Sequence, residues 1–339
     1  MDDLSASLRS RFPYLPLGNF PTRVERVSGL APPDVELWVK HENESSELFG
    51  GNKVRKLEFM LGAARACGMR HVSTFGGTGA HHVAATALHG AAHGFDVEAF
   101  VFPQPIDDHV RALLAVERAA GASVHEVASM LQVIPHRVYP RGAWLAGGGS
   151  SAVGTLGWVS GGGEILSQLP EIDVVYCALG SCGTVAGLWW SLRRARPIEI
   201  VAVRVAGRPV GKLLARRLLR GVSRLLDPLD IAPRGEMPAV RVVHDFLGPG
   251  YGWPSIESRA AVTRASEVGL ELDPIYTGKV MAALLHDARA GKLANKRVLF
   301  MRTQSTAPLD ARVILTSLRR REASGHVDCS TPIRAAGRA

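Results

Sequence analysis

The sequence predicts an α/β fold in which parallel sheets are covered by helices. Short apolar segments with strand character alternate with segments whose apolar residues recur at helical spacing. Glycine-rich turns follow several of the predicted strands. Alternation of this kind is typical of parallel sheets, and ligand-binding loops gather where the carboxyl ends of such strands meet.

The predicted elements run through most of the chain. Each strand is rich in β-branched or aromatic residues, and the strands are expected at residues 71–75, 97–102, 123–127, 173–179, 198–206, 239–246 and 297–303. Helices are expected between most of them, at residues 83–93, 110–120, 184–193, 256–268 and 280–290. A further helix is expected directly after Asn52.

Composition limits the class of protein. The 339 residues, of which 46% are hydrophobic, are enough for one large core or two lobes. No apolar run reaches about 18 residues and the N-terminus MDDLSASLRS has no apolar core, so neither a membrane span nor a signal peptide is expected. The four cysteines have no paired C-x-x-C spacing, which favours a reducing cytoplasm over a disulfide framework or a structural zinc site.

The formal net charge of +9 is concentrated in two places. Basic residues interleave with leucines between residues 208 and 225, as on a basic amphipathic helix. Such a helix can lie on a membrane, or it can present a solvated face while its leucines pack inward. Arginines also cluster at residues 319–321, ahead of a tail, 326–339, that is expected to be flexible. No nucleic-acid-binding motif accompanies the charge, so no nucleic-acid partner is expected.

Lys53 is the first candidate functional residue. It closes the stretch Gly50–Lys53, which precedes an apolar pattern of helical spacing from Val54 onward. Asn52 is a good N-cap, which places Lys53 in the first helical turn. A cation is disfavoured at the positive end of a helix, so the neutral amine that a Schiff base requires becomes easier to reach. The alternative is an ordinary solvated lysine.

Two glycine-rich loops are candidate anion sites. The loop at residues 180–184 follows an apolar strand and opens a helix, and its glycines would let the backbone approach a phosphate closely. It lacks the Gly-Lys-Ser/Thr sequence of a Walker loop, and a simple tight turn remains an alternative. The loop at residues 76–79 has the same strand–glycine–helix context.

The chain resembles the D-cysteine desulfhydrase and 1-aminocyclopropane-1-carboxylate deaminase family over residues 15–310. The resemblance is carried, in the same order, by the motif Gly-Gly-Asn-Lys, by both glycine-rich loops, and by later motifs around residues 250–254, 272–279 and 301–306. The resemblance implies pyridoxal 5'-phosphate (PLP) as cofactor and a two-lobed, tryptophan-synthase-β-like fold (PLP fold type II). It also implies a large PLP-binding domain of residues 1–55 and 163–325, and a small domain of residues 56–162.

The same resemblance assigns roles to residues. Lys53 carries PLP and serves as the catalytic base, with Tyr251 and Tyr276 as further catalytic residues. Substrate is expected at Ala80, His82 and Tyr251. The other cofactor-binding residues are expected to be Asn52, His81, Gly180, Ser181, Cys182, Gly183, Thr184, Thr277 and Thr303. No metal is expected, since His89 and His93 lie four residues apart without a carboxylate or cysteine to complete a site.

Several positions depart from the family pattern. Ala80 and His81 stand where the family has serine and asparagine, and Ala80 has no hydroxyl for proton transfer or carboxylate binding. Gln304 and Ser305 replace a glycine pair. Thr277 matches the desulfhydrase-like branch, whereas the deaminase branch has glutamate there. A hydroxyl does not keep the pyridine nitrogen protonated as a carboxylate would, which suits elimination.

The leading interpretation is a PLP-dependent lyase, a cytoplasmic homodimer that removes the Cα proton of a small amino acid and then performs β-elimination and deamination. A D-cysteine-type substrate would yield pyruvate, ammonia and sulfide. The alternatives are a diverged PLP enzyme that performs ring-opening deamination, β-replacement or racemisation, and a non-catalytic PLP-binding relative.

Overall fold

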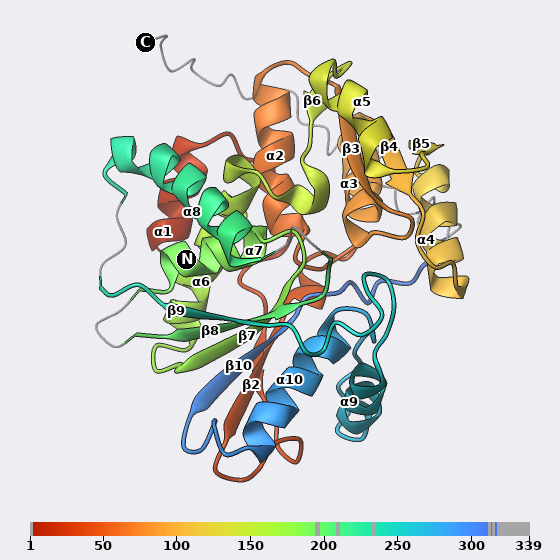
Figure 1. Cartoon of the computed structure of the whole chain (residues 1–339). Helices are drawn as coiled ribbons and strands as arrows, with labels where there is room; N and C mark the ends of the chain where they lie inside the picture. The colour runs from red at the N-terminus through yellow and green to blue at the C-terminus, as the bar shows by residue number, and fades with distance from the viewer. Residues whose placement is uncertain are drawn as a thin grey trace. The chain divides into compact units, whose positions relative to one another are not determined.

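The computed structural model describes residues 3–193, 197–207, 211–231 and 235–310, together with residues 313 and 316. The chain divides into two compact units. The first consists of residues up to Met60 together with Ala146–Ala307. The second consists of Leu61–Leu145 and the part of the chain from Pro308. Figure 1 shows the helices and strands of both units.

A six-stranded sheet forms the centre of the first unit. Its strands lie in the order β1 (Val24–Arg26), β2 (Glu36–His41), β10 (Arg297–Arg302), β7 (Val174–Leu179), β8 (Glu199–Arg204) and β9 (Ala239–Val243). Only β1 runs antiparallel to its neighbour. The carboxyl ends of the five parallel strands therefore meet at one edge, where the loops of the candidate site begin.

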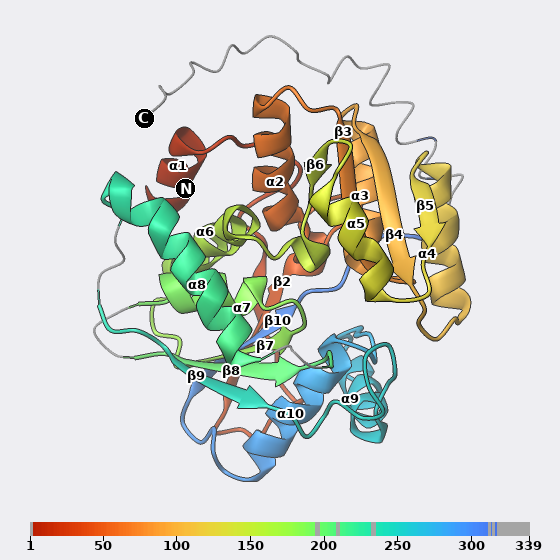
Figure 2. The same ribbon diagram turned by 45° about the horizontal axis from the view of Figure 1, so that its top comes forward.

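Helices cover both faces of this sheet, as Figures 1 and 2 show. Leu299 and Met301 of β10 face a core shared with α6 (Ala152–Gln168), α7 (Gly183–Ser191) and α8 (Lys212–Leu226). Val298 and Phe300 face the opposite core, shared with α9 (Ile256–Ser266) and α10 (Thr277–Arg289). The strand is thus buried on both sides, as its continuous apolar run requires. The N-terminal helix α1 (Asp3–Arg11) packs through Leu8 in a smaller cluster with α6.

The second unit is built on four parallel strands in the order β5 (Ser123–Glu126), β4 (Asp96–Phe102), β3 (His71–Gly77) and β6 (Ala143–Trp144). Its helices are α3 (His81–Ala92), α4 (Asp108–Ala119) and α5 (Ile134–Val138). Helix α2 (Val54–Ala66) begins in the first unit and ends in the second. Short 3₁₀ turns lie at Glu42–Glu44, Met130–Val133, Gly147–Gly149 and Asp227–Leu229.

The predicted α/β pattern is confirmed. Each predicted strand and helix forms within a few residues of its expected range, whereas β1, β2 and β6 were not predicted. In α8, Leu214 and Leu218 pack partly buried against the core, so the basic residues lie on the outer side of a packed helix. No described helix is long and apolar enough to cross a membrane. The division into a cofactor-binding and a small domain stays a prediction, and the tail 326–339 lies outside the described residues.

Candidate active site

Lys53 lies immediately before α2, which begins at Val54, whereas it was expected within the first helical turn. Its carbonyl accepts hydrogen bonds from the backbone amides of Lys56 (3.1 Å) and Leu57 (2.9 Å), so Lys53 itself occupies the cap position. The side chain of Asn52 accepts a hydrogen bond from Lys53 Nζ (2.9 Å) and donates one to Thr184 Oγ1 (3.2 Å). The predicted capping role of Asn52 is therefore wrong, and its side chain instead joins Lys53 to α7.

The amine of Lys53 is easier to deprotonate than that of an ordinary lysine. Burial lowers the pKa of Lys53 to about 8. At pH 7 about one molecule in ten therefore carries the neutral amine, compared with fewer than about one in a thousand at the usual pKa. The pKa of Lys53 is thus lowered, as predicted, but the cause is loss of hydration rather than the positive end of the helix.

The backbone around Lys53 needs its glycines. Gly51 has a φ of +98°, and a Cβ there would lie 2.8 Å from the carbonyl oxygen of Thr303. The next amide, that of Asn52, donates to the same carbonyl (3.0 Å). A Cβ on Gly50 would lie 2.0 Å from the carbonyl oxygen of Asn43. The motif loop is therefore pressed against its neighbours, and only glycine fits at these two positions.

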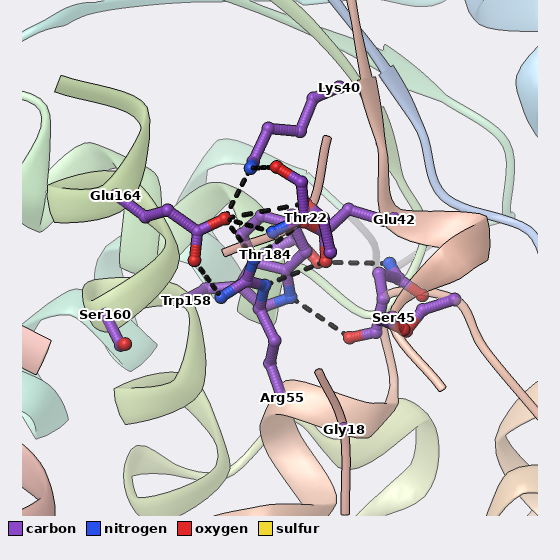
Figure 3. Close-up of polar contacts among 12 residues, drawn as sticks. Gly18, Thr22, Lys40, Glu42, Ser45, Arg55, Trp158, Ser160, Glu164 and Thr184 are labelled. Atoms are coloured by element: carbon purple, nitrogen blue, oxygen red, sulfur yellow. Dashed lines mark hydrogen bonds and ion pairs between the residues drawn. The ribbon is translucent and has the colours of Figure 1, made fainter. Parts of the chain in front are cut away.

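A buried ionic cluster around Arg55, in the first turn of α2, lies close to the same loop in sequence (Figure 3). Arg55 binds Glu42 through Nε (2.8 Å) and Glu164 through a terminal nitrogen (2.9 Å), and Lys40 forms a further ion pair with Glu164. Burial alone would raise the pKa of Glu164, but Arg55 and Lys40 outweigh it and lower that pKa. Trp158, on whose ring Arg55 stacks, donates from Nε1 to the carbonyl of Asn52 (3.1 Å).

The loop at residues 180–184 has the conformation of an anion cradle. Cys182 adopts a left-handed conformation (φ +69°), which explains why glycine suits this position. The Gly183 amide, at the N-terminus of α7, donates to Ser150 Oγ (3.1 Å), and Ser150 donates to Ser181 Oγ (2.7 Å). A Cβ on Gly183 would lie 2.7 Å from Ser150 Oγ and 2.9 Å from Lys56 Nζ.

Lys56 is the basic side chain beside this cradle, and its role was not predicted from the sequence. Its side chain is buried, and Nζ donates to the carbonyl of Gly148 (3.0 Å). No carboxylate among the described residues forms an ion pair with it. Burial lowers the pKa of Lys56 well below its ordinary value, and Lys53 lowers it further. A phosphate beside this amine and the N-terminus of α7 would accept hydrogen bonds from both, and its charge would favour the protonated form of Lys56.

The two predicted tyrosines meet. The hydroxyls of Tyr251 and Tyr276 lie 2.9 Å apart in a hydrogen bond. Burial raises the pKa of both, and for Tyr276 the neighbouring Tyr251 adds to the effect. Lys279, buried in α10, donates to the carbonyls of Leu247 (2.8 Å) and Gly250 (3.3 Å) and so fastens the loop that carries Tyr251. Lys279 is a second residue that the sequence motif contained but whose role was not predicted.

Thr277 begins α10 and is buried. Its hydroxyl donates to the carboxylate of Asp273 and accepts from the Asp273 amide (2.9 Å). Thr303, directly after β10, is also buried, and its carbonyl oxygen lies so close to Gly51 that a Cβ there would be 2.8 Å from it. These contacts place Thr277 and Thr303 at the carboxyl edge of the same sheet.

The three predicted residues of the other glycine loop belong to the second unit. Ala80 is the N-cap of α3 and makes no side-chain capping bond. His81 Nε2 lies 3.0 Å from His109 Nε2, and His82 Nε2 is hydrogen-bonded to Thr74 Oγ1 (2.9 Å). Within the described part of the chain, no group of three or more His, Cys, Asp or Glu side chains is arranged to hold a metal ion.

Comparison with known proteins agrees with this geometry. The model of the family described as pyridoxal-phosphate dependent enzyme matches residues 15–303. The chain is 35% identical over 317 residues to nocardicin C-9' epimerase from Nocardia uniformis subsp. tsuyamanensis. The alignment covers 87% of this chain and 93% of that protein. It is 30% identical over 327 residues to D-cysteine desulfhydrase from Klebsiella pneumoniae subsp. pneumoniae, covering 89% and 97%.

Solved structures share the fold. The crystal structure of an ACC deaminase homologue aligns over 94% of this chain and 100% of that chain, with a TM-score of 0.78 and 24% identity. O-ureido-L-serine synthase aligns over 95% and 96%, with a TM-score of 0.63 and 16% identity. The predicted fold type II of PLP-dependent enzymes is thereby confirmed.

Proposed function

This chain belongs to the family of pyridoxal-phosphate dependent enzymes, with PLP as cofactor, and from this premise we propose how it acts. It is a lyase and deaminase of small amino acids: it removes the Cα proton of a D-cysteine-type substrate and then eliminates the β-substituent, giving pyruvate and ammonia. Support comes from its similarity to D-cysteine desulfhydrase.

One observation carries the assignment of the site. Lys53, whose pKa burial lowers to about 8, is joined through Asn52 to Thr184, beside the buried amine of Lys56. In our proposal, Lys53 Nζ holds PLP covalently, while Lys56, Ser181 and the amides of the 180–184 loop hold its phosphate. PLP, when bound, withdraws electrons from the substrate Cα and makes its proton acidic.

In this proposal, the chain's own residues accept and hold the protons of the reaction. Lys53 Nζ would be the base that accepts the Cα proton, because an amine of pKa about 8 is a competent base near neutral pH. The paired hydroxyls of Tyr251 and Tyr276 hold a proton beside the departing group, since burial keeps both phenols neutral. Thr277 donates a hydrogen bond from its hydroxyl to Asp273, so a ring nitrogen beside Thr277 would meet a hydroxyl oxygen rather than a carboxylate.

The test is direct. Purified holoenzyme mixed with D-cysteine should release sulfide and pyruvate, and Lys53→Ala should abolish that release. β-Chloro-D-alanine, which has a better leaving group, should react as well. Absence of pyruvate from both compounds would contradict the lyase proposal.

Epimerisation is the second candidate, because the relative that is 35% identical is an epimerase and Ala80 lacks the hydroxyl of the desulfhydrase pattern. An epimerase would exchange the substrate Cα hydrogen for deuterium in D₂O and change optical rotation without releasing pyruvate. Pyruvate formation at the rate of exchange would exclude epimerisation.

We also propose that the protein is a cytoplasmic homodimer. Sedimentation of the purified protein would test the dimer.

A further inference from the structure

We propose that Asp273, acting through the hydroxyl of Thr277, holds the ring nitrogen of bound PLP in its protonated form. Asp273 is a positioning residue in this inference, since it acts on the cofactor only through Thr277. The inference rests on the proposed function, in which Lys53 holds PLP and the ring nitrogen lies beside Thr277. It reverses the expectation from the sequence, where a hydroxyl at residue 277 suggested a ring nitrogen that is not kept protonated.

The hydroxyl of Thr277 is oriented by Asp273. It lies at hydrogen-bond distance from Oδ2 of Asp273, and a carboxylate oxygen can only accept, so the hydroxyl hydrogen points to Asp273. The carbonyl oxygen of Asp273, 3.3 Å away, is a second acceptor on the same residue. The backbone amide of Asp273 can only donate, and it donates to the Thr277 oxygen (2.9 Å). Both residues are buried, so bulk water does not compete for these bonds.

The carboxylate of Asp273 is in turn fixed by the start of α10. Its Oδ1 accepts from the amides of Ile275 (2.9 Å) and Tyr276 (2.5 Å), and its Oδ2 accepts from the amide of Thr277 (2.9 Å). Every one of these groups donates to a carboxylate oxygen, which is the pattern of an ionised carboxylate. Asp273 therefore cannot turn away from Thr277 without breaking backbone hydrogen bonds.

One lone pair of the Thr277 oxygen is left over. A hydroxyl has one hydrogen and two lone pairs. Asp273 takes the hydrogen and fills one lone pair, and no other group among the described residues donates to this oxygen. Toward the cofactor, Thr277 can thus only accept. A pyridine nitrogen donates when it is protonated and accepts when it is neutral, so only the protonated ring avoids placing two acceptors against each other.

The charge of Asp273 acts in the same direction. Beyond burial and Tyr251, the charge of Asp273 raises the pKa of the Tyr276 phenol. Burial lowers the pKa of Lys279 to about 8, and the charge of Asp273 opposes that shift. Lys279 itself donates to two backbone carbonyls. The other charged groups that line the same pocket, Arg302 and Glu271, are of opposite sign. Asp273 is therefore the charge that is hydrogen-bonded to Thr277.

A protonated ring nitrogen withdraws electrons from the substrate more strongly than a neutral one. It would ease removal of the Cα proton by Lys53, a step that elimination and epimerisation share. The pair of Asp273 and Thr277 would then do through a hydroxyl what a glutamate does directly in the deaminase branch of the family.

Nitrogen NMR tests the inference without any turnover. Holoenzyme reconstituted with PLP carrying 15N in the ring reports the protonation state, because the chemical shift of a pyridine nitrogen changes strongly on protonation. The native protein should show the protonated form at pH 7. In Asp273→Asn, the new amide group can donate to Thr277 and turn the hydroxyl hydrogen toward the ring. The pKa of the ring nitrogen should then fall by about 1 to 3, the range for loss of one nearby charge.

Further variants guard against misfolding of Asp273→Asn. Thr277→Val removes the hydroxyl with little change in shape and should lower the pKa of the ring nitrogen as well, whereas Thr277→Ser should keep the native value. Glu271→Gln is the matched control, because it removes an exposed carboxylate two residues before Asp273 and should leave the nitrogen signal unchanged. A lower Tm without a change at the ring nitrogen would mean that Asp273 only holds the start of α10, and it would overturn the inference.

The same measurement separates this inference from the lyase proposal. A neutral ring nitrogen at pH 7 in native enzyme that releases pyruvate from D-cysteine would overturn the role of Asp273 alone. A protonated nitrogen that depends on Asp273 and Thr277, in enzyme that releases no pyruvate, would support that role and contradict only the lyase proposal.

Discussion

Two lysines at the start of α2, Lys53 and Lys56, dominate the electrostatics of the candidate site. Lys53 is hydrogen-bonded to Asn52 and has a pKa of about 8 through burial, whereas Lys56 points at the cradle and has no anionic partner among the described residues. The same low hydration thus favours two different roles. Lys53 is suited to act as a nucleophile and base, and Lys56 is suited to bind an anion.

Removing the charge of Lys56 should weaken PLP retention. Lys56→Met is expected to raise the Kd for PLP by about 10- to 100-fold, because one charge-assisted hydrogen bond to the phosphate is lost. Absorbance titration of the apoprotein with PLP measures this. Lys292→Met, which removes an exposed lysine paired with Asp287, should leave the affinity as it is. Equal PLP affinity in folded Lys56→Met would show that Lys56 does not hold the phosphate.

The pKa of Lys53 predicts how fast apoprotein combines with PLP at different pH values. Only the neutral amine attacks the aldehyde, so the rate should rise with pH and level off above about 8, as that pKa is passed. Stopped-flow absorbance between pH 6 and 10 follows this reaction. A rate that keeps rising toward the ordinary lysine pKa would indicate that the reacting amine is fully solvated.

At the scale of elements, the glycine-rich turns are explained by what they touch. Gly183 opens α7, and a Cβ there would lie within 3 Å of both Ser150 Oγ and Lys56 Nζ. Gly183→Val should therefore fold but retain PLP poorly, which dialysis against PLP-free buffer measures. Cys182→Gly, at the preceding position, should retain PLP like the native protein, since the φ of +69° at Cys182 is one that glycine adopts readily. Native retention in Gly183→Val would argue against the cradle.

Helix α4 of the second unit contains a carboxyl group that the site does not use. Glu117 is fully buried, and neither of its oxygens has a hydrogen-bond partner among the described residues. Burial raises its pKa to about 8. The folded state therefore keeps a proton that the unfolded state loses, and stability falls as pH rises between the two pKa values, by up to about 1.4 kcal/mol per pH unit.

Glu117→Gln should remove this dependence. The variant is expected to have a higher Tm than the native protein at pH 8, with the difference shrinking toward pH 5, and calorimetry at both values tests it. Glu126→Gln, at an exposed position of the same unit, is the control. A Tm difference that does not change with pH would show that Glu117 has the same pKa in the folded and unfolded states.

At the scale of the whole molecule, the sequence predicted strands such as β7 and β10 well because they are buried on both faces and read as apolar runs. β2 was missed since charged residues interrupt it, yet Lys40 is buried there because it pairs with Glu164. Partners so far apart in sequence cannot be matched from spacing. The same reason hid the cluster of Arg55 and Glu42 that supports the Lys53 loop.

The roles of the site residues remain predictions, and the structure shows which of these residues lie together. Lys53, Asn52 and Thr184 are joined by hydrogen bonds, as are Tyr251 and Tyr276. Lys56 could have been found, because it lies one helical turn after Lys53. Asp273 lay inside a recognised motif, but only the structure shows that its carboxylate accepts the hydrogen of the Thr277 hydroxyl.

The central claim is that Lys53, and no other lysine, carries PLP. Reduction of the holoenzyme with borohydride fixes the cofactor onto the amine that holds it, and peptide mass spectrometry then locates the modified residue. We expect the pyridoxyl group on the peptide that contains Lys53, with Lys56 and Lys279 unmodified. A pyridoxyl group on Lys56, Lys279 or any other lysine would contradict the account.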